Sequence, residues 1–208
     1  LSVNKQSQYS AQNYLITKND SVVFTTNFAK KDELIVRFSN SEISRIVVSC
    51  FLKEFGPALP PFSSKEAVEP VFKADSTFIL TLNTNQFKIN MPEKGFYHIQ
   101  TGQDDNEGLN LFTYDENFPG VADSDEMISS TRYIMTKEEY EACKSAADKK
   151  SCIDNFWLNS AGSQERAREL LKRYYGRVKE ANKNYSSFTQ GWKSDKGMAF
   201  IVFGPPLN

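Results

Sequence analysis

One stretch near the C-terminus decides how this chain is interpreted: Phe188-Thr189-Gln190-Gly191-Trp192-Lys193-Ser194-Asp195-Lys196-Gly197, then the apolar run of residues 198–203, then Gly204-Pro205-Pro206. Glycine permits tight turns, serine and aspartate side chains bond to neighbouring amides, and two prolines end a regular element. The stretch therefore fixes a backbone path around one large anchor, Trp192. We interpret it as structural first. If it binds a ligand, we expect Trp192, Asp195 and Lys196 to make the contacts.

The run of residues 198–203 carries apolar side chains at both odd and even positions. This pattern is typical of a strand covered on both faces, so we predict a central strand that follows Gly197 and ends at Gly204. The C-terminal half offers no second convincing strand to pair with it. We therefore expect the chain to be truncated at its C-terminus. The strand would pair with the N-terminal half, with residues after 208, or with another molecule.

Three helices are predicted upstream of this stretch. Thr136 and Glu139 form a capping box that starts a helix ending near residue 146, and Asp148 starts the next helix. The longest helix begins after Ser163 and ends near residue 184, and its apolar residues recur every three or four positions: Ala167, Leu170, Leu171, Tyr174, Tyr175, Val178 and Ala181. Gly176 inside it costs about 1 kcal/mol relative to alanine, which predicts close packing there.

The N-terminal part is predicted to be all-β. Short runs separated by turn residues occupy positions 21–26, 33–38, 46–55, 77–82, 86–90, 95–101 and 109–114. Their number and spacing indicate an antiparallel β-sandwich of immunoglobulin-like size. We assign residues 1–18 to a polar lead-in, 19–115 to the sandwich, 116–130 to an acidic linker, and 131–208 to a small α+β domain with one long amphipathic helix. The predicted fold class is thus a mixture of β and α/β structure.

The three cysteines give information about the cellular compartment of the protein. Cys143 and Cys152 are nine positions apart across a helix–helix turn, close enough to form a disulfide if the compartment is oxidising. Cys50 lies in an apolar run and is interpreted as a small buried hydrophobic residue. Three cysteines and the single histidine, His98, make a structural zinc site improbable, and we expect no metal and no cofactor.

The sequence offers little for catalysis. His98 alternates with apolar neighbours on a predicted strand, and no nucleophile elbow, phosphate-binding loop or zinc-protease motif is present. The acidic cluster at residues 103–108 is interpreted as a solvated hairpin tip rather than a calcium loop. A net charge of −1 excludes a global basic field for nucleic acid, and no apolar run is long enough to cross a membrane. The basic outer face of the long helix is either a solvated surface or a docking surface for an acidic partner.

The C-terminal residues resemble one known family. Gly191-Trp192-Lys193-Ser194-Asp195-Lys196-Gly197 followed by Gly204-Pro205-Pro206 is similar to the GWxTD domain family of bacterial cell-envelope proteins. Upstream, Arg132-Tyr133-Ile134, the capping box, Phe156-Trp157 and the long helix match that family in order and spacing, so the resemblance spans about residues 130–206. The family usually has threonine where Ser194 stands. The resemblance implies a β-rich region before the motif and an origin in Bacteroidetes-type bacteria, and it brings no established activity.

Taken together, we expect a non-catalytic scaffold or accessory subunit, and not an enzyme. The resemblance implies export to the periplasm or outer membrane, as a lipoprotein if a lipid anchor lies upstream of residue 1, with other envelope proteins as partners. The alternative is a carbohydrate- or peptide-binding module that uses Tyr97, Tyr114 or Trp192 as an exposed platform. A third hypothesis is a hydrolase whose carboxylates come together only in the fold.

Overall fold

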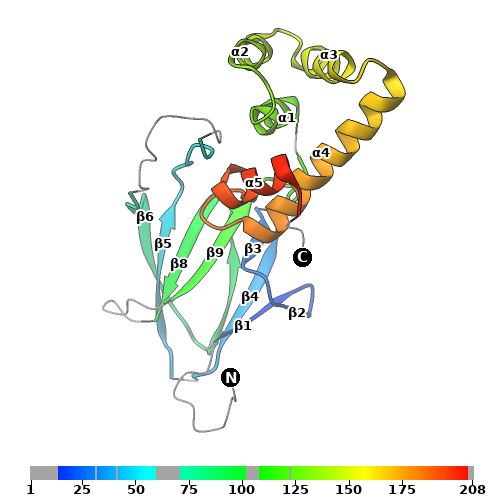
Figure 1. The fold of residues 1–208 in the computed structure, drawn as a ribbon. Coiled ribbons are helices and arrows are strands. Elements are labelled where there is room, and N and C mark those ends of the chain that lie inside the picture. The colour runs from blue at the N-terminus through cyan, green and yellow to red at the C-terminus, as the bar shows by residue number, and fades with distance from the viewer. Residues whose placement is uncertain are drawn as a thin grey trace. The chain divides into compact units, whose positions relative to one another are not determined.

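The computed structural model describes residues 14–30, 32–40, 42–59, 71–101, 108–121 and 123–205 (Figure 1). The chain divides into two compact units, and each takes two separate segments of sequence. The β unit comprises Leu1–Lys53 and Phe72–Thr113, and the helical unit comprises Glu54–Val71 and Tyr114–Asn208. The predicted order of β structure before helices is therefore correct, but residues 54–71 belong to the second unit.

The described strands form two sheets. One has four strands in the order β2-β1-β4-β7, and the other has five in the order β3-β9-β8-β5-β6. The strands are β1 Tyr14–Lys18, β2 Ser21–Val23, β3 Asn27–Ala29, β4 Glu33–Phe38, β5 Arg45–Phe51, β6 Ser76–Thr81, β7 Gln86–Asn90, β8 Gly95–Gln100 and β9 Leu109–Tyr114.

Both sheets bury side chains in one shared hydrophobic cluster. In β4, Leu34, Val36 and Phe38 are buried and alternate with exposed residues, as the period of a half-buried strand requires. The antiparallel register sets Val36 opposite Phe87 of β7. From the five-stranded sheet, alternate residues of β5, β8 and β9 enter the same cluster: Ile46, Val48, Cys50, Tyr97, Ile99, Leu109 and Leu111.

The prediction for residues 1–18 is wrong at its end, because β1 occupies Tyr14–Lys18 and pairs with both β2 and β4. Ile16 of this strand is buried in the shared cluster. Asn19 and Asp20 join β1 to β2 with positive φ angles of 49° and 59°, which is the geometry of a two-residue hairpin turn. Asparagine and aspartate tolerate positive φ, so this pair is a sequence signal for the turn that the sequence analysis missed. Residues 1–13 lie outside the described residues.

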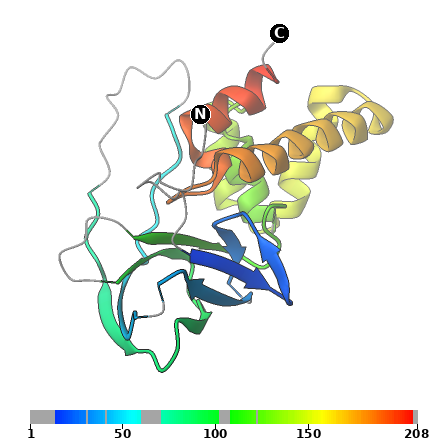
Figure 2. The ribbon, with the colours of Figure 1, turned by 90° about the horizontal axis from the view of Figure 1, so that it is seen from below.

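The helical unit contains five described α-helices and one short 3-10 helix, which are α1 Ser124–Thr131, α2 Lys137–Ser145, α3 Lys149–Ala161, α4 Gln164–Tyr185, η1 Gly191–Lys193 and α5 Asp195–Phe203. Helix α4 packs against α3, η1 and α5, and Figure 2 shows α5 lying alongside it. The buried face of α4 includes Ala167, Tyr174, Val178 and Ala181, as its periodicity predicts. The capping box at the start of α2 is confirmed by both of its hydrogen bonds.

Residues 116–130 are not an exposed linker. They contain most of α1, whose Ile128 is buried in the core of the helical unit. Asp123 is the N-cap and accepts a hydrogen bond from the Glu126 amide, while Asp125 and Glu126 lie in the first turn. Acidic residues are favourable there because the N-terminal end of a helix carries partial positive charge. The acidic composition that suggested a linker is thus the start of a helix.

The strand predicted at residues 198–203 is also wrong, because these residues belong to α5. Met198 and Ile201 are buried, three positions apart, and Phe203 is exposed at the end of the helix. A short apolar run does not distinguish a buried strand from a buried helix by periodicity alone. The side chain of Ser194 decides between them, since it accepts the Gly197 amide and starts the helix. Because residues 198–203 are helical, they have no unpaired strand edge. The expected pairing of these residues with another segment is therefore also wrong.

Candidate functional site

Residues 191–197, here called the glycine–tryptophan turn, pass very close to neighbouring backbone. A β-carbon added to Gly191 would lie 1.9 Å from the carbonyl oxygen of Ala181 in α4. A β-carbon on Gly197 would lie 1.8 Å from the carbonyl oxygen of Gly191. Any side chain at either position would therefore collide with main-chain atoms. Glycine is required because α4, η1 and α5 meet backbone to backbone.

A small network of hydrogen bonds closes the turn. The Gly191 carbonyl accepts bonds from the Ser194 amide at 3.1 Å and from the Ser194 hydroxyl at 2.7 Å. Ser194 Oγ in turn accepts the Gly197 amide at 3.0 Å, which makes Ser194 the N-cap of α5. The Gly191 amide donates to the Ser186 hydroxyl at 2.7 Å. These polar groups are thus satisfied inside the protein.

Trp192 anchors the turn to the rest of the helical unit. Its side chain is 2% exposed, and its indole N–H donates to Gln190 Oε1 at 3.0 Å. Its amide donates to Oδ1 of the buried Asn182 at 3.0 Å, and Asn182 Nδ2 donates to the Pro119 carbonyl at 2.9 Å. Its carbonyl accepts the Tyr133 hydroxyl at 2.9 Å. Burial raises the pKa of Tyr133, so this donor remains protonated.

The residue after the tryptophan ties the turn to the segment that precedes residue 60. The Lys193 carbonyl accepts the Ala58 amide at 2.6 Å. Lys193 Nζ lies 3.8 Å from a carboxylate oxygen of Glu54 and 5.5 Å from the centre of the Trp192 ring. This contact explains why residues 54–59 belong to the helical unit although they follow a strand of the β unit.

The three residues expected to contact a ligand do not share an accessible surface. Asp195 and Lys196 are exposed in the first turn of α5, whereas Trp192 is buried. Gly204 ends α5 with φ of 89° and donates to the Phe200 carbonyl. Pro205 is exposed after it, and Pro206 lies outside the described residues. The expectation of a ligand site at Trp192, Asp195 and Lys196 therefore gains no support from their geometry.

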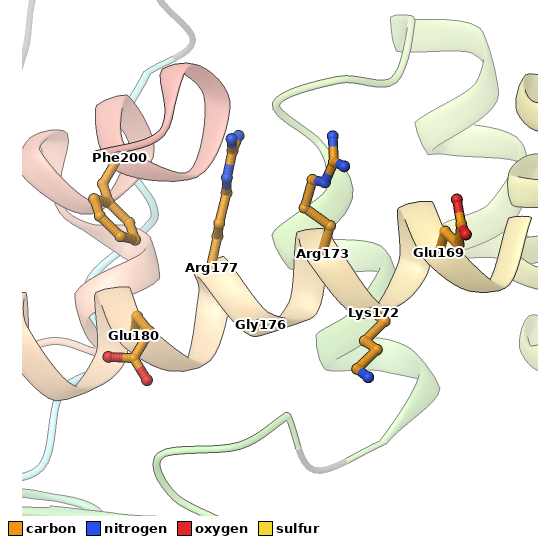
Figure 3. A pocket seen from close by; sticks show the side chains of 7 residues that line it. All are labelled: Glu169, Lys172, Arg173, Gly176, Arg177, Glu180 and Phe200. Atoms are coloured by element: carbon orange, nitrogen blue, oxygen red, sulfur yellow. The ribbon is translucent and has the colours of Figure 1, made fainter. Parts of the chain in front are cut away.

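A groove on α4, here called the arginine groove, lies where α5 packs against that helix. Its volume is about 530 Å³, and it is lined by Glu169, Lys172, Arg173, Gly176, Arg177, Glu180 and Phe200. Figure 3 shows Arg173 and Arg177 extending to the same side of the helix, with Phe200 of α5 beside Arg177. A β-carbon on Gly176 would meet nothing within 4 Å. The close packing predicted at Gly176 is thus wrong, and this glycine leaves space in the groove instead.

The charges in the arginine groove have different roles. Arg177 is half-buried and donates to the Ile201 carbonyl at 3.0 Å, which satisfies the C-terminal end of α5. Glu180 forms an ion pair with Lys183 at 2.8 Å. Lys172 and Arg173 are exposed, and in the described part of the chain neither forms an ion pair. With three basic and two acidic residues in its lining, the groove has a net positive charge of +1.

A family model for the GWxTD domain matches residues 95–208, more than half of the 208 residues. The chain belongs to the GWxTD domain family. The glycine–tryptophan turn is its GWxTD motif, with serine at the position that the family name gives to threonine. Neither the curated proteins nor the solved structures contain a match to this chain. The matched region also includes β8 and β9, so it begins well before the residues on which the resemblance was noticed.

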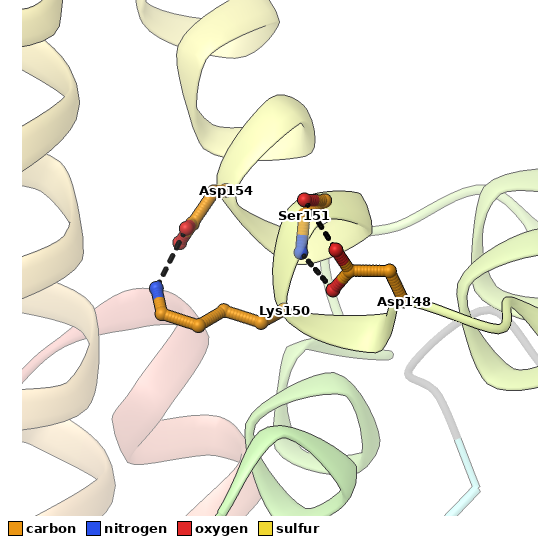
Figure 4. A network of polar contacts seen from close by, with 4 residues as sticks. All are labelled: Asp148, Lys150, Ser151 and Asp154. Atoms are coloured by element: carbon orange, nitrogen blue, oxygen red, sulfur yellow. Dashed lines mark hydrogen bonds and ion pairs between the residues drawn. The ribbon is translucent and has the colours of Figure 1, made fainter.

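The GWxTD protein has a second polar centre at the turn between α2 and α3, here called the disulfide hairpin (Figure 4). Cys143 and Cys152 are joined by a disulfide, with Cα atoms 5.4 Å apart. Between them, Asp148 caps α3 by accepting the Ser151 amide at 3.0 Å and hydroxyl at 2.8 Å. These two bonds lower the pKa of Asp148. Cys50 is the remaining cysteine; it is buried and forms no disulfide.

The single histidine of the GWxTD protein, His98, lies on β8. His98 Nδ1 lies 2.6 Å from Asn110 Oδ1 on the neighbouring strand. Among the residues that the structure describes, no group of three histidine, cysteine, aspartate or glutamate side chains is placed to hold a metal. All of the acidic cluster at residues 103–108 except Gly108 lies outside the described residues. A search of the described helices finds none with the length and hydrophobicity needed to cross a membrane.

The aromatic platform expected of a sugar- or peptide-binding module is not exposed. Tyr97, Tyr114 and Trp192 are all buried. The Tyr114 hydroxyl donates to the Ser187 carbonyl, and the Tyr97 hydroxyl donates to the Glu93 carbonyl. These residues were expected to be exposed because of their type, and residue type alone does not reveal which side chains face the core. The arginine groove was missed as a site, although the basic face of α4 was recognised.

Proposed function

We propose that this GWxTD protein is a non-catalytic scaffold or accessory subunit of a cell-envelope assembly, and that the arginine groove holds an acidic segment of a partner protein. The observation that carries the proposal is the pair of exposed basic side chains, Lys172 and Arg173, in an open groove of about 530 Å³. Two cations without an ion pair in a concave site favour an anionic partner.

The charge of α4 supports an acidic partner. The helix carries seven basic residues and three acidic ones, a net charge of +4, in a chain whose net charge is −1. Arginine presents a planar fork of donors that matches a carboxylate with two parallel hydrogen bonds. Phe200 adds an apolar contact beside these charges. We therefore expect the bound segment to combine glutamate or aspartate with an aliphatic or aromatic side chain.

The groove is also held in shape before a partner arrives. Arg177 is fixed by its bond to the Ile201 carbonyl, and Glu180 by its ion pair with Lys183. The wall that carries Phe200 follows directly from the GWxTD motif, whose polar groups are satisfied by internal hydrogen bonds. A preformed site loses less conformational entropy on binding. Side chains that are held in place in this way support a rigid docking element better than a site that turns over a substrate.

The disulfide between Cys143 and Cys152 supports an exported location, because such bonds persist in oxidising compartments. We infer the periplasm or the outer membrane, with a lipid anchor upstream of residue 1 as the means of attachment. We also infer that the two sheets form a sandwich, which their shared hydrophobic cluster supports, and that α4 is the single long helix of the helical unit. No described feature specifically favours the carbohydrate-binding hypothesis or the hydrolase hypothesis.

Charge reversal in the arginine groove tests the docking function. The Lys172→Glu, Arg173→Glu double variant should bind an acidic probe peptide of glutamate and leucine roughly tenfold more weakly, since each exposed ion pair contributes about 0.2–1 kcal/mol. Arg166→Glu with Arg168→Glu is the matched control, because it makes the same change of charge at two arginines that are exposed on the same helix and do not line the groove. Binding should weaken as salt concentration rises.

The natural partner is then sought by co-purification from envelope membranes, with the same variants. A partner retained by the parent chain and by the Arg166→Glu, Arg168→Glu control, but lost from the Lys172→Glu, Arg173→Glu double variant, supports the proposal. Equal loss from the control and the double variant would mean that the net charge of α4 matters and the groove does not. Retention of a glycan in place of a protein would favour the carbohydrate-binding alternative.

A further inference from the structure

Strand β6, Ser76–Thr81, forms one edge of the five-stranded sheet and pairs only with β5 among the described strands (Figure 1). It contains no charged residue, no proline and no glycine. Phe78 is 42% exposed and Ile79 is 49% exposed, so apolar side chains are accessible on both faces of the strand. Native proteins usually protect such an edge, because its free N–H and C=O groups pair readily with another chain.

The other described edges are protected. Strands β2 and β3 have three residues each, too short to align a long partner. Strand β7 has Lys88, which forms an ion pair with Glu33 of the adjacent strand. Short strands and charged side chains are two of the ordinary ways in which sheets avoid edge-to-edge association. Strand β6 has neither, which singles it out as an edge adapted to pairing.

The pairing with β5 identifies the polar groups of β6 that face outward. The Leu82 amide donates to the Ser44 carbonyl on the β5 side, and the register continues from there as Arg45 opposite Thr81. Backbone groups of successive residues in an antiparallel strand point alternately to one neighbour and the other. The N–H and C=O groups of Thr77, Ile79 and Thr81 therefore lie on the open edge.

We propose that β6 pairs antiparallel with β6 of a second copy of this chain, about a two-fold axis at Ile79. In this register each Ile79 lies opposite its own counterpart, Thr77 lies opposite Thr81, and Phe78 lies opposite Leu80. All three residues with outward backbone groups then pair with one another, as hydrogen-bonded positions require. The two five-stranded sheets become one sheet of ten strands.

The sequence of β6 favours a second copy over a different protein, because Thr-Phe-Ile-Leu-Thr is nearly symmetric about Ile79. A two-fold interface is isologous, so a strand at its axis must complement itself. Thr–Thr and aromatic–aliphatic pairs across strands are each favourable, and no like charges meet. Each exposed apolar side chain of the edge gains a partner from the other copy.

Paired charge substitutions at Ile79 test the proposal. Lysine at this position places two like charges opposite each other at the two-fold axis, and so does glutamate. Ile79→Lys alone and Ile79→Glu alone should be monomeric at concentrations where the parent chain is dimeric, as measured by sedimentation velocity. An equal mixture of the two variants should recover the dimer, since each pair then has opposite charges. Recovery also shows that both variants are folded.

The control is Phe24→Lys, the same change of charge at an apolar side chain of the β unit that is 86% exposed. It should leave the dimer intact. Hydrogen exchange gives a second measurement, because the amides of Thr77, Ile79 and Thr81 should become protected on dimerisation while those of Phe78 and Leu80 change little. A parent chain that is monomeric at every concentration, or a dimer that survives Ile79→Lys, would overturn the proposal.

Discussion

Two turns of the helical unit begin a helix by the same local device and depend on very different surroundings. In the disulfide hairpin, Asp148 accepts the amide of Ser151 three residues later. In the GWxTD motif, Ser194 accepts the amide of Gly197, also three residues later. The first cap is exposed and lies between two bonded cysteines. The second is partly buried and surrounded by the backbone of α4 and η1.

The comparison shows that a cap specifies where a helix begins. The surroundings of the cap determine how much of the stability of the helical unit depends on it. An exposed cap such as Asp148 competes with water, so the hairpin is also held covalently. The Ser194 cap is partly buried, and its hydroxyl donates to the same acceptor, the Gly191 carbonyl, as the amide of this serine. A change at the exposed turn should therefore be tolerated better than a similar change at the buried one.

The largest effect is expected from Gly191→Ala. The new methyl group would lie 1.9 Å from the Ala181 carbonyl oxygen, and the atoms that it meets are main-chain atoms of α4, which cannot rotate away. We expect the helical unit to lose more than about 4 kcal/mol of stability, or to fail to fold, as measured by chemical denaturation. Gly176→Ala is the matched control, because its methyl group meets nothing within 4 Å. It should stabilise α4 by up to about 1 kcal/mol.

Removing the covalent link should have the next largest effect. Cys143→Ser with Cys152→Ser should destabilise the helical unit by about 2–3 kcal/mol, the chain-entropy value for a short loop. Denaturant unfolding of the oxidised parent and the double variant measures the difference. Thiol labelling of the denatured, unreduced parent should find one reactive cysteine, Cys50. Three reactive cysteines would show that the disulfide is absent, and the main support for an exported location would then be lost.

Ser194→Ala should cost about 1–2 kcal/mol, since it removes a helix cap and leaves the Gly197 amide without its acceptor. Ser194→Thr keeps the hydroxyl and restores the residue in the family name, so its unfolding free energy should stay close to that of the parent. Thermal unfolding of both variants measures the contrast. Equal losses in the two would show that the space around the side chain matters more than the hydrogen bond.

The smallest effects are expected from pH, and they have opposite signs at the two turns. The pKa of Asp148 is lowered by its bonds to Ser151, so its stabilising contribution is present above the unfolded pKa and disappears as the pH falls below about 4. Asp148→Asn should therefore differ from the parent in melting temperature near neutral pH and converge with it in acid.

At the buried turn, burial raises the pKa of Tyr133, whose hydroxyl donates to the Trp192 carbonyl. A raised pKa stabilises the fold below the unfolded value of about 10 and loses that contribution as the pH rises above it. The advantage of the parent over Tyr133→Phe should therefore shrink in alkali, as followed by melting temperature and tyrosinate absorbance. Convergence in acid instead would contradict this sign.

The sequence predicts structure best where the information is local. The capping box of Thr136 and Glu139 and the start of α4 after Ser163 each depend on a few adjacent residues, and the structure has both. The strand at Glu33–Phe38 is likewise found within its predicted bounds, because its apolar alternation is regular. Such features need no knowledge of distant contacts.

Predictions failed where the local structure is determined by contacts with residues outside the segment itself. The run 198–203 is helical because the N-cap at Ser194 and the backbone of α4 position it, and neither is visible in its own pattern. Gly176 and Gly191 look alike in sequence, yet one faces open space and the other faces a carbonyl oxygen. The arginine groove needs Phe200 of α5 beside Arg177 of α4, a contact between residues far apart in the chain.

The division of the chain into units has a consequence for how this protein can be inherited and recombined. The chain leaves the β unit after Lys53, returns at Phe72, and leaves again after Thr113. The region shared with the family, residues 95–208, includes two strands of the β unit and omits Ala58, whose amide bonds to the GWxTD motif. Exchanging that contiguous region between relatives would therefore exchange parts of both units, so a viable chimera must also carry the matching Glu54, Phe55 and Ala58, which contact the helical unit.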